Sequence, residues 1–177
     1  VMSFEDGTLV GFRDQRCLGT VDLLETGGLE QFFANKGLGP EPWPELRSGS
    51  WWSTQLHGLS GPLKPALMRQ DKVAGIGNIL AAEMCWLAGL SPLRGIPDLS
   101  PNDWNAIASA AHKVIGRGLA AAAGDEIRYV GEGRSSPEEN PFSVYGREGT
   151  SCPRCAGVIR RDPQAGRSTF WCETCQA

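Results

Sequence analysis

Two Cys-x-x-Cys pairs near the end of the chain constrain its fold more than any other feature. Cys152 and Cys155 form the first pair, Cys172 and Cys175 form the second, and sixteen residues separate them. A tetrahedral Zn²⁺ takes four soft ligands at about 2.3 Å, and each pair can supply two thiolates from one turn. Disulfides in a secreted protein are the alternative, but the spacing favours zinc. We predict one structural zinc ion, because four cysteines leave no position open for a catalytic water.

The segment between the two cysteine pairs has the pattern of a β-hairpin. Residues 157–160 and 168–171 are typical of short strands, and Asp-Pro-Gln-Ala-Gly at 162–166 is typical of a turn. The zinc ion would hold this hairpin in place rather than catalyse a reaction. We predict that its tip presents three arginines, which are Arg160, Arg161 and Arg167.

Composition and cysteine usage indicate a compartment. The chain has 177 residues, 41% of them hydrophobic, which is enough for a core. Cys17 and Cys85 lie far from the pairs and are expected to stay reduced, as in the cytoplasm. The start of the chain lacks the pattern of a signal peptide, and no apolar run approaches the length of a membrane-spanning helix. We therefore expect a cytoplasmic protein without a membrane partner.

The net charge of −3 argues weakly against a nucleic-acid partner, but the charges are unevenly distributed. Residues 1–60 contain 4 Lys or Arg and 8 Asp or Glu, whereas residues 140–177 contain 5 Arg and 3 acidic residues. Contacts with phosphate depend on where local charges lie. Positive charge gathers around the predicted zinc module.

The first third of the chain has a strand-like pattern. Asp6-Gly7 lies between two alternating runs and predicts a hairpin, and a further strand is expected near residues 19–24. Because one hairpin and one more strand cannot form a stable sheet alone, we interpret residues 1–33 as remnant strands of an N-terminal β-sandwich. Residues 34–61 are rich in Gly and Pro and are predicted to be a linker that leads into a helix near residues 50–58.

The middle of the chain, residues 62–143, is predicted to be helical and to end in a polar loop. Helices are expected at 63–69, at 78–88 with Asn78 as its N-cap, and from Ser100-Pro-Asn-Asp103 to about residue 123. Residues 144–177 complete the chain as the zinc hairpin. The fold class is therefore α+β.

A glycine-rich turn precedes the second of these helices. Gly75 and Gly77 flank Ile76 just before Asn78. Glycines allow close approach of a ligand, and a helix N-terminus offers free N–H groups and a partial positive charge, which suits phosphate. Such turns are also common as plain helix connections. No predicted strand precedes this turn, so it lacks the context of a dinucleotide-binding site.

Taken in order, these motifs resemble the formamidopyrimidine-DNA glycosylase / endonuclease VIII family. The resemblance extends from about residue 4 to 175, and its segments are Asp14-Gln-Arg-Cys-Leu-Gly19, Lys64 to Gln70, Val73 to Glu83, Gly89-Leu-Ser-Pro92, Val144 to Gly149 and the zinc hairpin. It implies an N-terminal β-sandwich, a helix–two-turn–helix domain over residues 62–143 and a zinc-ribbon hairpin over residues 144–177.

The resemblance also implies roles for individual residues. Asn78 and Arg167 match residues that bind the phosphate backbone at the lesion, and Gly75 and Gly77 belong to the same two-turn loop. Lys64 matches a lysine near the lesion pocket, and Tyr145 matches a residue near the DNA backbone. Arg16 matches an arginine that enters the duplex where the damaged nucleotide is flipped out. The implied partner is double-stranded DNA with a damaged base or an abasic site, bound by a monomer in the bacterial nucleoid.

The implied activity is base-excision repair, with removal of oxidised purines such as formamidopyrimidine and 8-oxoguanine and cleavage at the abasic site. Two departures from the family weigh against catalysis. This chain begins with Val1-Met2 where the family uses an N-terminal proline amine, and Leu18 replaces the usual aromatic. Lys64 is a candidate substitute amine. The chain is therefore expected to be the C-terminal part of a glycosylase/AP lyase, or a truncated paralogue that binds damaged DNA without cutting. A role in protein–protein contact alone is a third hypothesis.

Overall fold

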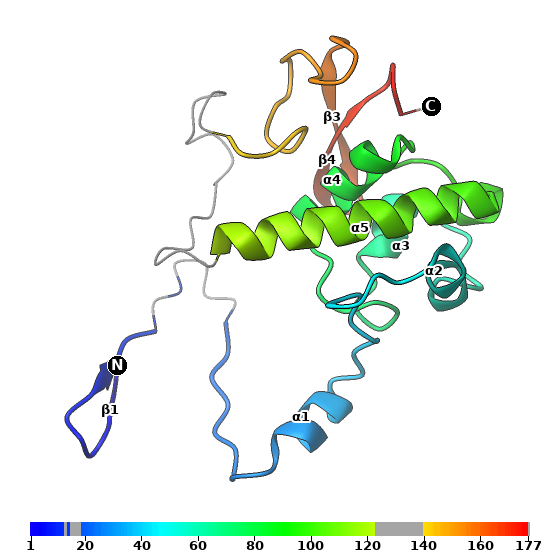
Figure 1. Cartoon of the computed structure of the whole chain (residues 1–177). Helices are drawn as coiled ribbons and strands as arrows, with labels where there is room; N and C mark the ends of the chain where they lie inside the picture. Colours follow the sequence, from blue (N-terminus) through cyan, green and yellow to red (C-terminus); the bar gives the residue numbers. More distant parts are fainter. Residues whose placement is uncertain (13, 15–18, 123–139, 177) are drawn as a thin grey trace. The chain divides into compact units, whose positions relative to one another are not determined.

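The computed structural model describes residues 1–12, 14, 19–122 and 140–176, which divide into two compact units, Val1–Lys36 and Gly37–Ala177. Arg16 and Leu18, both singled out from the sequence, lie outside the described residues. The relative placement of the two units is not defined, so each is considered by itself (Figure 1).

The first unit contains one small hairpin and one helix. Strands β1 (Met2–Ser3) and β2 (Leu9–Val10) pair antiparallel across the predicted Asp6-Gly7 turn. Helix α1 (Leu29–Asn35) was not anticipated, because its adjacent phenylalanines are also typical of strands.

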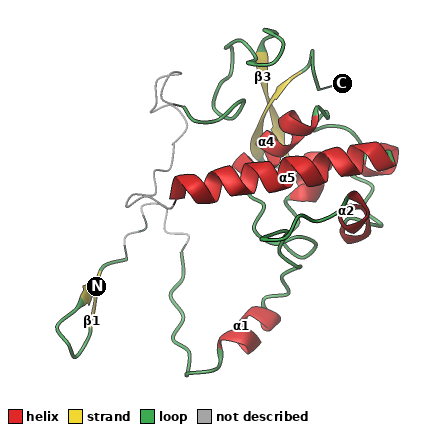
Figure 2. Ribbon diagram, viewed as in Figure 1, coloured by secondary structure: helices red, strands yellow, loops and turns green. Residues whose placement is uncertain are grey.

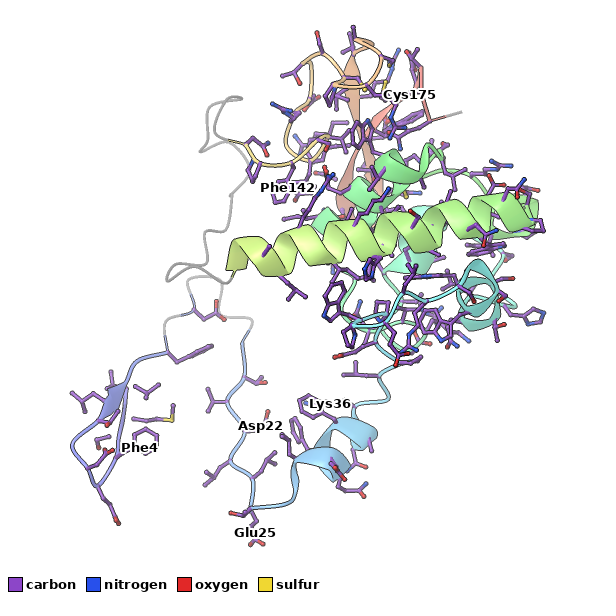
Figure 3. All side chains as sticks on the ribbon, in the orientation of Figure 1. Phe4, Asp22, Glu25, Lys36, Phe142 and Cys175 are labelled. Carbon is purple, nitrogen blue, oxygen red and sulfur yellow. The ribbon has the colours of Figure 1, made fainter. Side chains whose placement is uncertain are left out.

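The strand predicted near residues 19–24 is not formed, since no described neighbour offers these residues a sheet edge. No described side chain of the first unit is buried. Leu23 is fully exposed, and Phe4, labelled in Figure 3, is 54% exposed.

Four helices build the described part of the larger unit. The longest of them runs across the others (Figures 1 and 2). They are α2 (Gly49–Gln55), α3 (Leu63–Leu67), α4 (Asn78–Ala88) and α5 (Pro101–Ala122), with the short 3₁₀ turn η1 (Ile96–Asp98) between the last two. Helix α5 packs against α2 and α4. Apolar side chains from all four helices form the main core, including Trp52, Leu67, Met84 and Ile107.

Local sequence signals explain where these helices begin and end. Ser48 caps α2 by accepting a hydrogen bond from the Trp51 amide. The predicted capping box opens α5: Asp103 accepts from the Ser100 amide at 2.8 Å, and the Ser100 hydroxyl accepts from the Asp103 amide at 3.3 Å. Helix α4 ends at Gly89, as predicted. These signals account for where α2 and α5 begin and where α4 ends.

The zinc-ribbon hairpin consists of β3 (Ile159–Gln164) and β4 (Arg167–Cys172). Both strands are longer than predicted, and only Ala165 and Gly166 turn the chain, with φ of 49° and 73°. Positive φ at both central residues is the signature of a tight two-residue turn. The predicted turn at 162–166 was therefore wrong, because Pro163 lies inside β3, where a two-stranded hairpin tolerates it as an edge residue.

This register corrects the predicted arginine tip. Arg160 pairs across the hairpin with Trp171, and Arg161 pairs with Phe170, so both lie along the strands. Arg167 alone of the three flanks the turn, opposite Gln164.

Candidate functional site

The four predicted cysteines meet at one point. All four Sγ atoms lie within 4.8 Å of one another, with Cys152 and Cys175 3.8 Å apart and Cys155 and Cys172 3.4 Å apart. Tetrahedral zinc with bonds of about 2.3 Å places its sulfur ligands about 3.8 Å apart. The cluster therefore fits one zinc ion held by four thiolates, as the sequence predicts.

Helix α4 supports this zinc centre from its C-terminal half. The Trp86 indole donates to Cys152 Sγ at 3.4 Å, and the Arg154 guanidinium lies 4.4 Å from the centre of the Trp86 ring. Arg154 also donates to the Leu87 carbonyl, and Gln176 donates to the Leu90 carbonyl. These contacts, together with a second apolar cluster that includes Phe170 and Tyr145, fix the ribbon on the helix.

A polar cluster lies at the opposite end of α4, where three elements meet. Lys64 of α3 is only 1% exposed, and its ammonium donates to Asn78 Oδ1 at 2.7 Å, Thr169 Oγ1 at 2.9 Å and the Ser168 carbonyl at 3.3 Å. An ammonium has three donors, so all of them are used. Lys64 therefore joins α3, α4 and β4.

Asn78 has a different role from the predicted N-cap. Helix α4 begins at Asn78 with Gly77 in the capping position, and no side chain caps it. The Asn78 carboxamide instead points at the hairpin, where Nδ2 donates to the Ser168 carbonyl at 3.2 Å and to the Tyr145 hydroxyl at 3.4 Å. A cap prediction uses local sequence only and cannot anticipate a partner 90 residues away.

Glu83 positions the segment that carries Tyr145. Its buried carboxylate accepts hydrogen bonds from three successive amides, those of Ser143, Val144 and Tyr145, at 2.8 to 3.0 Å. Phe142, labelled in Figure 3, packs edge-on against the Tyr145 ring with centroids 5.9 Å apart. Tyr145 is thereby held beside Asn78.

The site carries excess positive charge. Arg167 is exposed beside Ser168, and within the described ranges no carboxylate forms an ion pair with Lys64 or with Arg167. Burial and the nearby charge of Arg167 together lower the pKa of Lys64 to about 8, and an electrostatic interaction with Cys85 opposes this shift. Two neighbouring cations without a partner acid favour an anionic ligand.

The two glycines before α4 differ in whether the backbone conformation requires glycine. Gly75 has φ of 87°, a conformation that side chains rarely adopt, and its amide donates to Gln70. Gly77 is extended, with φ of −96°, and a Cβ there would meet no heavy atom within 4 Å. The fold therefore requires glycine at position 75, but nothing in the described residues requires it at position 77.

The structure brings together several residues selected from the sequence, through connections that the sequence did not indicate. Lys64 and Tyr145 both form hydrogen bonds with Asn78. Arg167 lies beside this group because its neighbour Ser168 accepts a hydrogen bond from Asn78. Thr169 and Gln164, which link the cluster to the hairpin, were not anticipated. The Lys64–Thr169 pair is 105 residues apart in sequence, so no local pattern could indicate it.

The fold and site define a class of protein: a helix–two-turn–helix domain with a four-cysteine zinc ribbon packed on one of its helices. Residues 38–128 match the family model described as the formamidopyrimidine-DNA glycosylase H2TH domain, and residues 149–177 match a zinc finger found in formamidopyrimidine-DNA glycosylase and isoleucyl-tRNA synthetase. Because the first match spans just over half of the chain, the chain belongs to the formamidopyrimidine-DNA glycosylase family.

Individual relatives agree with this assignment. The formamidopyrimidine-DNA glycosylases of Brucella ovis and of a Chelativorans strain are each 38% identical to the chain over 170 and 174 residues, covering 93% of it. The chain spans only 58% and 59% of the lengths of these two relatives.

Solved structures of the family superimpose well on the chain. The match to a MutM complex with DNA containing carbocyclic 8-oxo-G has a TM-score of 0.76 at 31% identity. It covers 92% of our chain and 60% of the MutM chain. Lactococcus lactis formamidopyrimidine-DNA glycosylase bound to DNA with an abasic site has a TM-score of 0.77 at 28% identity, with coverage of 92% and 59%. None of the described helices of our chain combines the length and apolar character needed to cross a membrane.

Proposed function

We propose that the larger unit binds double-stranded DNA at a damaged base or an abasic site and holds the phosphate backbone between the start of α4 and the hairpin tip. The observation that carries this proposal is the hydrogen bond of Asn78 to the Ser168 carbonyl, because Ser168 directly follows Arg167 in the hairpin. A carboxamide, a helix N-terminus and a guanidinium around one point are suitable partners for a phosphate.

The charge of the site supports the same proposal. The overall charge of the chain is −3, yet Lys64 and Arg167 interact electrostatically, and neither forms an ion pair with a described carboxylate. DNA phosphates would supply the missing negative charge and release counterions, so binding should weaken as salt rises. Two related structures contain DNA with carbocyclic 8-oxo-G or with an abasic site. Such lesions are therefore the expected targets of this chain.

Gly77 provides a further argument. The position is exposed, extended and free of steric conflict, so an alanine would fit the protein itself. A ligand that approaches the backbone at the start of α4 would explain why glycine occurs there.

We infer that Lys64 does not serve as the attacking amine of a lyase reaction. Lys64 is 1% exposed, and its ammonium uses all three donors inside the protein. A Schiff-base nucleophile must be accessible and deprotonated at the sugar carbon. If the chain is a glycosylase/AP lyase, another amine performs this step, and the alternative is a protein that binds lesions without cutting them.

Binding to a fluorescent duplex tests the proposal. The zinc-loaded 177-residue chain should bind a duplex with one tetrahydrofuran abasic-site analogue more tightly than the same duplex without a lesion. Simultaneous replacement of Asn78 and Arg167 by Ala should remove this preference. Equal affinity for both duplexes, unaffected by the double replacement, would instead favour a role in protein–protein contact.

Borohydride trapping on a natural abasic duplex separates the two forms of the proposed function. A covalent adduct would show that an amine of this chain forms a Schiff base and that the chain is a lyase. Binding without an adduct would support the binding-only alternative. An adduct that is lost in Lys64→Met but retained in Lys113→Met would overturn our inference about Lys64, because Lys113 is an exposed lysine of α5.

A further inference from the structure

Lys64 takes part in a closed circuit of hydrogen bonds, here named the Lys64 ring. Its ammonium donates to Thr169 Oγ1 at 2.9 Å, Thr169 donates to Gln164 Oε1 at 3.1 Å, and Gln164 Nε2 donates to the Pro92 carbonyl at 3.0 Å. The same Pro92 carbonyl accepts from the Lys64 backbone amide at 3.2 Å, which closes the ring. The ring therefore ties both strands of the hairpin to α3 and to the loop that follows α4.

The Lys64 ring contacts the hairpin next to its turn. Gln164 and Arg167 are the paired residues on either side of the Ala165-Gly166 turn, and Thr169 lies two residues beyond Arg167. Thr169 is completely buried, so its hydroxyl cannot exchange these partners for water. The hydrogen bonds of the Lys64 ring therefore hold the backbone on both sides of the turn, and with it the backbone of Arg167.

The ammonium also decides how Asn78 is oriented. Lysine can only donate, so the Asn78 atom facing it at 2.7 Å must be the carbonyl oxygen Oδ1. Nδ2 is then directed to the Ser168 carbonyl and the Tyr145 hydroxyl. A neutral amine would have one donor fewer than the three acceptors around it, and one contact of Lys64 would be lost.

From this geometry we infer that Lys64 is a positioning residue, which orients Asn78 and Arg167 as one rigid phosphate clamp without touching DNA itself. The inference rests on the proposed function and deepens it. Because Lys64 is 1% exposed, a phosphate would meet Asn78 and Arg167 and not the ammonium. Preorganised donors lose less entropy on binding, so the clamp binds a phosphate more tightly than the same residues would if they were mobile.

A pH dependence distinguishes this role from simple packing. The groups that face Lys64 are Arg167 of β4, Cys85 of α4 and, through Asn78, the Tyr145 hydroxyl. Burial raises the pKa of Cys85 to about 12, so the thiol stays neutral, whereas burial and Arg167 lower the pKa of Lys64 to about 8. A bound phosphate would raise the pKa of Lys64 again. The complex then holds more protons than the free protein, and affinity falls as pH rises through about 8.

The test measures the affinity of the zinc-loaded chain for the tetrahydrofuran duplex at about pH 7 and about pH 9. We expect Lys64→Met to bind about tenfold more weakly than the unmodified chain near pH 7 and to lose most of the pH dependence. Lys113→Met removes the same charge from the exposed face of α5 and should change neither the affinity nor its pH profile. Zinc content and circular dichroism, measured without DNA, report whether each variant is folded.

A second variant keeps the ammonium and breaks the ring. Thr169→Val preserves shape but removes the hydroxyl between Lys64 and Gln164, and we expect it to weaken binding at least about threefold. If Lys64 instead contacted DNA directly, Thr169→Val would bind normally, which would overturn the inference. Unchanged affinity and pH profile in Lys64→Met would also overturn it while leaving the proposed function intact. Failure of the unmodified chain to prefer the abasic duplex would remove the proposed function, and this inference with it.

Discussion

The Trp86 indole nitrogen donates a hydrogen bond to Cys152 Sγ, with 3.4 Å between the two atoms. This contact joins the middle of the helix–two-turn–helix domain directly to a zinc ligand. The hydrogen bond favours the thiolate form of Cys152, which is the form that binds metal. Helix α4 therefore supports the zinc centre at one end and the proposed phosphate clamp at the other.

Trp86→Phe should weaken zinc binding while preserving the aromatic packing. Loss of a hydrogen bond to a metal ligand typically lowers metal affinity about 10–100-fold. Competition with a chromogenic chelator measures the change. Trp104→Phe makes the same substitution in the main helical core, away from the cysteines, and should leave zinc affinity unaltered. Equal zinc affinities for the two variants would show that the indole contact does not tune the metal.

Cys152→Ser should unfold the hairpin and leave the helices intact. The metal supplies folding energy to the ribbon, whereas the main core is built from α2 to α5 without ribbon residues. Zinc content should fall below one per chain, the helical circular dichroism should persist, and preference for abasic DNA should disappear because Arg167 loses its position. Retention of one zinc per chain would contradict this expectation.

Glu83→Gln should destabilise the segment around Tyr145. The carboxylate accepts three backbone hydrogen bonds, whereas a carboxamide offers one oxygen and turns an NH₂ group toward amides that also donate. At least one of these buried or half-buried amides loses its partner, at a cost of about 1–3 kcal/mol in the free energy of unfolding. Chemical denaturation measures the loss, and hydrogen exchange at Ser143 to Tyr145 localises it. Unaltered exchange at these amides would exclude this role for Glu83.

The sequence predicted the elements of this protein better than it predicted their connections. The cysteine spacing defined the zinc centre, and Ser100 with Asp103 defined the start of α5, because both signals are local. Asn78 has the local signature of a cap, but its partners are Lys64, 14 residues earlier, and Ser168, 90 residues later. Only the tertiary fold brings such partners together, so the cap prediction was wrong.

The hairpin turn is a second case in which pairing with another segment overrides a local sequence signal. Asp162 and Pro163 are favourable turn residues, yet both belong to β3, and Trp171 donates to the Asp162 carboxylate at 2.6 Å. Pairing with β4 therefore overrides the turn preference of this segment.

Gly75→Ala should reduce the stability of the fold, whereas Gly77→Ala should reduce DNA binding alone. Gly75 has φ of 87°, so alanine should reduce stability by about 1 kcal/mol. Gly77 has an ordinary backbone conformation and open space around it, so alanine should leave the melting temperature unchanged. If a phosphate approaches the backbone here, Gly77→Ala should still weaken DNA binding. Thermal melts and affinities for the tetrahydrofuran duplex separate the two effects, and a Gly77→Ala chain with normal affinity would place the phosphate elsewhere.

Arg167→Ala should weaken DNA binding and reduce its dependence on salt. Each phosphate neutralised by a cationic side chain contributes about 0.9 to the slope of log affinity against log salt for duplex DNA, so losing one contact makes the slope shallower by about one. Arg160→Ala is the matched control, because Arg160 lies on the same hairpin but is opposite Trp171 and pairs with Glu173. If both variants lose the same slope, the contribution is general attraction to the hairpin and not a contact of Arg167. If only Arg167→Ala loses it, the tip of the hairpin meets a phosphate, and the Lys64 ring that holds this tip acquires a function in recognition.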